Sequence, residues 1–139
     1  MKRAVVSIVL LLVVVLTFAA CAPKYSADTN TYSEDLVLKT ELDSYSTDVT
    51  EIKFIVKNIS DEEQAFGFKM HLLKNVEGEW KVVEYQKEVY WIDLAQVLEP
   101  GGEAEKTIKL DEWYRLPLAK GEYKIVLSDD AVSNSFKIE

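Results

Sequence analysis

The chain has 139 residues and a formal net charge of −8, with 48% hydrophobic and 29% charged residues. This composition is typical of a globular protein and excludes a disordered chain, and the length suits one domain behind a targeting segment. An acidic surface repels nucleic acid and anionic lipid headgroups, so neither is an expected partner.

The first 21 residues have the pattern of a secretory signal. A positive start, Met1 to Arg3, precedes an apolar run over residues 4–20, and Ala19 and Ala20 lie directly before Cys21, the only cysteine. A charged start, an apolar run and small residues before a cleavage point define such signals. The segment resembles the lipobox of bacterial lipoproteins, although Phe18 stands where that pattern usually has Leu.

The resemblance implies cleavage before Cys21 and attachment of a diacylglyceryl group, with acyl chains such as palmitate, to its thiol. Two acyl chains give stable membrane attachment where one chain is marginal. Two alternatives stay open: a membrane-spanning helix, which needs roughly 17–20 apolar residues, and a plain secretory signal that leaves a free cysteine. The expected location is extracytoplasmic, with a lipid anchor in the bacterial cell membrane.

We therefore divide the chain into a signal peptide (1–20), a lipidated N-terminus with a flexible tether (21–34) and one folded domain (35–139). Loss of residues 1–20 removes two positive charges and no acidic residue, which leaves a net charge of −10. With Cys21 lipidated, the domain has no disulfide, and its hydrophobic core must be sufficient by itself.

Alternation of apolar and polar residues predicts strands along most of the domain. The pattern leaves 88–94 open between a strand and an irregular crossing, and it places Trp80 in the core. A helical turn is expected near Trp113, with Asp111 as its cap. Pro100 and Gly101 suit a type II turn. The predicted strands lie at about 36–42, 51–57, 66–72, 80–85, 106–110, 121–127 and 132–138.

The stretch 116–127 has the features of a tyrosine corner. Gly121 permits a turn that bulkier residues resist, and Tyr123 begins the alternating strand that follows. A Tyr in this position can direct its hydroxyl back to upstream backbone, as in Greek-key sandwiches. We expect Gly121 and Tyr123 to form this structural corner.

Four short motifs occur in the order typical of bacterial immunoglobulin-like (Ig-like) domains, at 55–60, 77–80, 98–101 and 118–125. The run from residue 52 to 138 resembles such a domain. The resemblance implies an all-β, Greek-key sandwich of about seven to nine strands, and an accessory module without catalytic residues. A weaker resemblance, to small Ig-like bacterial proteinase inhibitors, lacks an evident inhibitory loop.

The residue inventory offers little for catalysis or metal binding. His71, the only histidine, is out of phase with the apolar positions of its strand, so we expect it to face solvent. One histidine and a lipidated cysteine cannot supply the three or four ligands of zinc. We predict no enzyme activity, no metal and no cofactor, although acidic turns at 61–63, 111–112 and 129–130 leave calcium open. The sequon at Asn58 is expected to be turn chemistry, not a glycosylation site.

The chain has more aromatic residues than the predicted core can hold, and this excess suggests a binding site. Tyr90, Trp91 and Trp113 are the candidate binding surface. Either they seal an open end of the sandwich, or they are exposed for contact with a protein or a glycan. The first hypothesis is a protein-interaction or accessory module that binds an unknown envelope protein. The second is a module that binds carbohydrate or wall polymer, and the third is an inhibitor of an extracellular protease.

Overall fold

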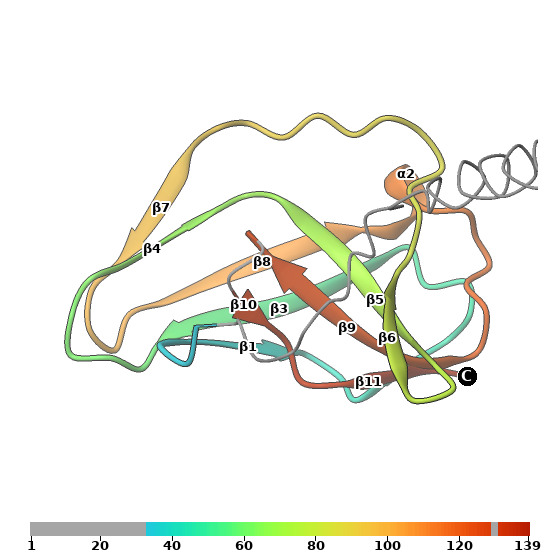
Figure 1. Ribbon diagram of the computed structural model, residues 1–139, viewed down its shortest axis with the longest axis horizontal. Coiled ribbons are helices and arrows are strands. Elements are labelled where there is room, and N and C mark those ends of the chain that lie inside the picture. Colours follow the sequence, from blue (N-terminus) through green and yellow to red (C-terminus); the bar gives the residue numbers. More distant parts are fainter. Residues whose placement is uncertain (1–32, 129–130) are drawn as a thin grey trace, which may run out of the picture.

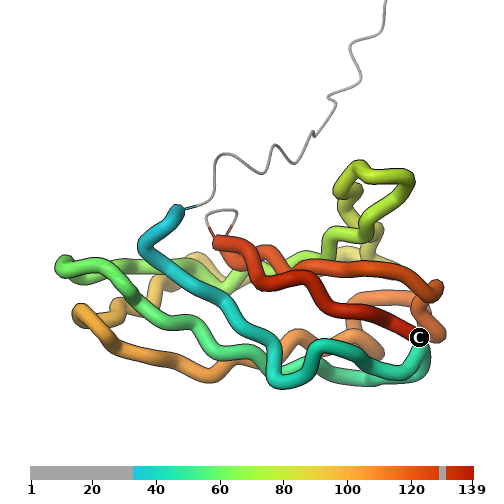
Figure 2. Tube along the Cα trace, turned by 90° about the horizontal axis from the view of Figure 1, so that it is seen from below, coloured from blue at the N-terminus to red at the C-terminus, as the bar shows by residue number. Residues whose placement is uncertain are grey.

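The computed structural model describes residues 33–128 and 131–139, so the predicted signal peptide, Cys21 and all but the last two residues of the predicted tether lie outside the described residues. The fold is a β-sandwich, as predicted, with two layers of strands seen edge-on in Figure 2. Nine described strands have three or more residues, and two have only two residues. The strands are β1 Leu36–Thr40, β2 Ser44–Tyr45, β3 Glu51–Asn58, β4 Gln64–Gly67, β5 Met70–Val76, β6 Glu79–Val82, β7 Ala95–Leu98, β8 Glu103–Lys109, β9 Gly121–Leu127, β10 Ala131–Val132 and β11 Phe136–Ile138.

One layer has the strand order β1-β3-β8, and the other has the order β2-β11-β9-β5-β6, with β10 also paired to β9. Because β2 lies in the second layer, the chain leaves the first layer after β1, after β3 and after β8, three strands that Figure 1 labels. β4 and β7 form a separate two-stranded ribbon. A short helix, α2 (Leu110–Trp113), lies between β8 and β9.

The core lies between the two layers and is made by the alternating positions that the sequence indicates. In β3, Ile52, Phe54 and Val56 are buried while the residues between them are exposed. In β9, Tyr123 and Ile125 face them from the opposite layer. Each fully buried side chain of this size contributes about 1.5–3 kcal/mol through removal of apolar surface from water, so the core needs no disulfide.

The stretch before β9 has the geometry of a tyrosine corner. The hydroxyl of Tyr123 donates a hydrogen bond to the carbonyl oxygen of Ala119 at 2.6 Å, and the ring is buried against Phe136. Gly121 has φ +151°, and a Cβ there would lie 3.0 Å from the side chain of Lys74. Only glycine adopts this conformation without strain, so Gly121 and Tyr123 together set the start of β9.

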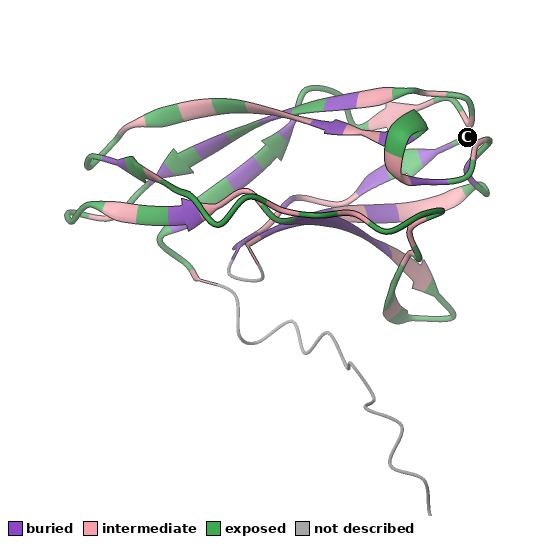
Figure 3. Ribbon diagram, turned by 90° about the horizontal axis from the view of Figure 1, so that it is seen from above, coloured by how far each residue is buried: buried purple, intermediate pink, exposed green. Residues whose placement is uncertain are grey.

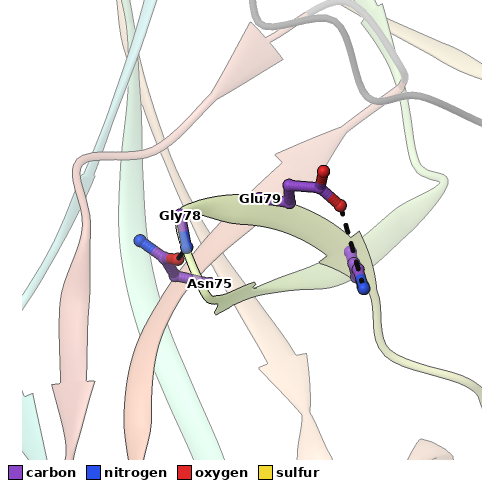
Figure 4. A network of polar contacts seen from close by, with 4 residues as sticks. Asn75, Gly78 and Glu79 are labelled. Carbon is purple, nitrogen blue, oxygen red and sulfur yellow. Dashed lines mark hydrogen bonds and ion pairs between the residues drawn. The ribbon is translucent and has the colours of Figure 1, made fainter.

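Two tight turns follow their sequence signals. The N–H of Gly102 donates to the carbonyl oxygen of Glu99 at 2.8 Å, and Gly101 has φ +74°, which is type II geometry. In the β5–β6 hairpin, Glu77 and Gly78 both have positive φ. This is the type I′ turn that matches the strand twist. The Gly78 N–H donates to Oδ1 of Asn75 at 2.9 Å, which completes the turn (Figure 4).

The prediction that Trp80 lies in the core is wrong. Trp80 pairs with Asn75 in a hairpin that projects from the sandwich (Figures 2 and 3). Its ring is half-buried on the outer face of the layer, where the ammonium of Lys124 lies 4.4 Å from its centroid. Alternation identifies one face of a strand, but a hairpin that extends past the opposite layer has no core to meet.

The prediction that His71 faces solvent is also wrong, because its side chain is only 6% exposed. β5 lies between β9 and β6, with His71 opposite Val126 in register. Val126 and Leu73, on the same outer face, are buried as well. A central strand can be covered on both faces, and the period of two alone does not reveal this.

One local prediction is wrong, and one open choice is settled. α2 begins after Lys109, with no side-chain cap, and Asp111 lies in its first turn, not at its cap. The open choice at residues 88–94 is settled as an irregular crossing, since this segment forms no strand and β7 begins only at Ala95.

The sequon residue Asn58 is fully buried at the end of β3. Its Nδ2 donates to the carbonyl oxygens of Glu62, at 2.7 Å, and Leu98, at 3.0 Å. Its Oδ1 accepts hydrogen bonds from both the backbone N–H and the hydroxyl of Ser60. A side-chain amide with both donors and its acceptor engaged in the interior is structural, as the turn interpretation expects.

Candidate interaction surface

The connection between β6 and β7 is held to the sandwich by its aromatic residues. The ring of Trp91 meets that of Trp113 of α2 edge-to-face, with centroids 4.7 Å apart, and lies 6.4 Å from the ring of Tyr85. All three are partly buried against the core. The backbone N–H of Gln86 also donates to the carbonyl oxygen of Trp113 at 2.8 Å. These contacts fix one side of the connection and leave the other side to solvent.

A second pair of contacts joins this aromatic cluster to the middle of the sandwich. The hydroxyl of Tyr85 donates to the carbonyl oxygen of Met70, and the Tyr114 hydroxyl accepts the N–H of Leu72 at 2.9 Å. The two tyrosine rings lie 5.3 Å apart. Burial, followed by the neighbouring Tyr85, raises the pKa of Tyr114 far above its ordinary value. The cluster therefore belongs to the fold and gives the outer segment a rigid base.

Large apolar side chains are exposed along the outer side of the same segment. Tyr90 is 82% exposed, Ile92 69%, Leu94 60% and Val97 56%. We call these four residues the apolar run; Figure 3 colours the segment that carries them exposed or intermediate nearly throughout. Exposed apolar residues gathered in one stretch, unlike single ones, mark contact surfaces.

The surroundings of the apolar run are acidic. Residues 84–99 contain four acidic side chains, Glu84, Glu88, Asp93 and Glu99, and a single basic one, Lys87. The hydroxyl of Tyr90 donates to the Glu88 carboxylate at 2.7 Å, and this bond raises the pKa of the tyrosine. The segment therefore offers exposed apolar side chains together with an excess of acidic residues along its own sequence.

The structure divides the three predicted surface residues. It brings Trp91 and Trp113 together on the inner side of the segment and turns Tyr90 outward. Sequence reasoning missed Ile92, Leu94 and Val97. The alternation of Tyr90, Ile92 and Leu94 with Trp91 and Asp93 was the available signal for Ile92 and Leu94, since it places them with Tyr90 on one side of an extended segment. Val97 is out of phase with this alternation, and the pattern does not indicate its exposure.

Within residues 33–128 and 131–139, no three His, Cys, Asp or Glu side chains are grouped in a way that could hold a metal ion. Among the same residues, no helix has the length and hydropathy of a membrane span. The acidic turns at 61–63 and 111–112 fall in this range, whereas that at 129–130 lies outside it.

Three solved structures that match part of this chain belong to longer proteins. An alkylpurine DNA glycosylase of Pseudomonas fluorescens, bound to DNA with an abasic-site analogue, has a TM-score of 0.43 and 8% identity over 77% of this chain and 31% of its own. A β-glucosidase of Erythrobacter marinus has a TM-score of 0.42 and 13% identity over 74% and 15%. A β-glucosidase of Listeria innocua in complex with glucose has a TM-score of 0.42 and 15% identity over 75% and 16%. The chain spans less than a third of each.

No curated protein matches the chain. The sequence pattern of the bacterial Ig-like domain matches residues 32–137, which is most of the chain and every described strand but the last residue of β11. This chain belongs to the bacterial Ig-like domain family.

Proposed function

We propose that this protein is a cell-envelope lipoprotein whose Ig-like domain is a non-catalytic interaction module, with the apolar run as its contact surface. The observation that carries this proposal is the exposure of four large apolar side chains on one segment, backed by a buried aromatic cluster. Burial of such side chains against a partner removes apolar surface from water and so stabilises the complex.

The carbohydrate-binding hypothesis receives less support. It requires several exposed aromatic rings in a row, and of the three candidates only Tyr90 is exposed. Trp91 and Trp113 present their rings to each other and to the core. A protease inhibitor needs a protruding loop, and the hairpin that projects here ends in a two-residue type I′ turn, too tight to lie extended in a protease cleft.

The membrane anchor is tested by Cys21→Ser in the full chain expressed in a bacterial host. We expect the variant to lose labelling by a radioactive or alkyne fatty acid and to retain an uncleaved N-terminus. The physical reason is that the thiol of Cys21 is the only thiol in the chain that can carry the diacylglyceryl group. Continued fatty-acid labelling of the serine variant contradicts the proposal.

The contact surface is tested by photo-crosslinking in living cells, with a photoreactive residue at position 92. We expect a discrete protein adduct, because Ile92 projects to solvent at the centre of the apolar run. Position 59, in the turn after β3, has an isoleucine that is also exposed and serves as the matched control. A diffuse adduct that a muramidase removes favours the wall-polymer hypothesis, and no adduct at position 92 overturns the proposed surface.

A further inference from the structure

The backbone beside the apolar run has a free edge. β7 pairs with β4 along one side, and no other described strand pairs with its second side. Residues 88–94 have no backbone hydrogen-bond partner within the part of the chain that the structure describes. Together these residues expose N–H and C=O groups over a stretch long enough for a further strand, since strands in proteins have about 5–6 residues.

Two edges of the main layers, β8 and β6, are protected. β8 is the edge of its layer, and Lys106, opposite Phe54 in register, points toward the interior. Its ammonium lies 4.5 Å from the centroid of the Phe68 ring and 5.6 Å from that of Phe66. Inward charges on an edge strand prevent the pairing of another chain. The edge strand β6 carries charges of both signs instead, on Glu79 and Lys81.

The segment 88–97 has neither an inward-pointing lysine nor charges of both signs, since its charged residues are the acidic Glu88 and Asp93. It contains no Lys and no Pro. Its outward side chains Ile92, Leu94 and Val97 are of the kinds that pack well across paired strands. The ring of Trp91 holds the segment against Trp113, so the edge is ordered before a partner arrives, which reduces the entropy cost of binding.

Charge indicates what the partner strand is. A second copy of this chain, with a net charge of −10 once residues 1–20 are removed, would bring the same acidic segment, so repulsion opposes self-pairing. A basic segment is attracted by Glu84, Glu88, Asp93 and Glu99. Apolar residues at alternate positions of that segment would lie on the same face as Tyr90, Ile92 and Leu94, which are themselves two residues apart.

We propose that residues 88–97 accept an extended, basic segment of a partner protein as an added β-strand, with alternate apolar side chains over the apolar run. This inference rests on the proposed function and specifies its binding mode. The main chain supplies hydrogen bonds, and the alternate side chains of the guest strand supply selectivity.

The test uses the full chain in detergent micelles to select from a displayed library of random ten-residue peptides. The Ile92→Lys chain is used for counter-selection, to remove peptides that bind without Ile92. The Ile59→Lys chain is the matched control, with its substitution at an exposed site outside the segment. We expect a consensus with apolar residues at every second position and Lys or Arg between them. Hydrogen exchange with the selected peptide should slow at the amides of 88–97, and N-methylation of its pairing amides should weaken binding by about tenfold or more.

A consensus without alternation or with acidic residues, no enrichment over the Ile92→Lys chain, or equal binding of the N-methylated peptide overturns strand addition. If one of these results is found and a protein adduct still forms at position 92 in cells, only the binding mode is contradicted. The proposed interaction module is then still supported. Absence of the adduct removes the proposed function itself, so the two failures are distinguishable.

Discussion

Replacement of Asn58 by Ala is expected to lower the free energy of unfolding by about 2–4 kcal/mol. The Asn58 side chain is fully buried and makes four hydrogen bonds. Its loss leaves the Leu98 carbonyl oxygen without that donor in the interior, where each unpaired polar group costs about 1–3 kcal/mol. Its backbone also pairs with Gly101 and Gly102, so β3, the turn after it and the β7–β8 turn all depend on this position.

Chemical denaturation followed by tryptophan fluorescence measures the effect. Asn75→Ala is the matched control, because Asn75 is a half-buried asparagine whose side chain bonds only Gly78 and Glu122 in the projecting hairpin. We expect this control to lose about 0.5–1.5 kcal/mol. Similar losses in the two variants would contradict the role of Asn58 in joining these elements.

Replacement of Tyr114 by Phe is expected to lower the free energy of unfolding by about 1–3 kcal/mol. The Tyr114 hydroxyl accepts the N–H of Leu72 deep in the core, and phenylalanine leaves this donor unpaired. Tyr123→Phe is the control, because its hydroxyl donates to the carbonyl of the exposed Ala119, which water can reach. That variant should lose only about 0.5–1.5 kcal/mol. A Tyr123→Phe loss equal to or larger than that of Tyr114→Phe is the contrary outcome.

The same tyrosine gives a pH signature. Burial raises the pKa of Tyr114 far above its ordinary 10.0, so the folded state holds this proton more tightly than the unfolded chain does. Its contribution to stability is complete below pH 10.0 and is lost as the pH rises above that value. Thermal unfolding between pH 9 and pH 11 should therefore show a steeper fall for the native chain than for Tyr114→Phe.

The Ig-like sandwich fold was predictable because the sequence signals for its strands and turns are local. Period-two alternation in β3 and β9 reflects the geometry of a strand with one buried face, whatever lies beyond it. The turn at Pro100 and Gly101 and the corner at Gly121 follow from backbone conformations that few other residues adopt. These features need no knowledge of distant parts of the chain.

The candidate surface was only partly predictable. The aromatic character of the 88–94 segment is visible in the sequence, and so is its choice between strand and crossing. Which of Tyr90 and Trp91 faces outward depends on the position of Trp113, more than twenty residues away along the chain. The candidate surface was predicted from aromatic residues alone, so the exposed aliphatic residues Ile92 and Leu94 were not included.

The sequence by itself determined the all-β class, the two-faced strands, the turns and the acidic charge, because each depends on residues that are near neighbours or on a simple count. Only the tertiary structure decided which faces are covered twice, as at His71, and which extend past the core, as at Trp80. It also decided that Lys106 protects the edge at β8, while one side of residues 88–97 has no paired strand among the described residues. Burial and pairing are properties of the neighbours that a segment meets, and these neighbours come from distant parts of the chain.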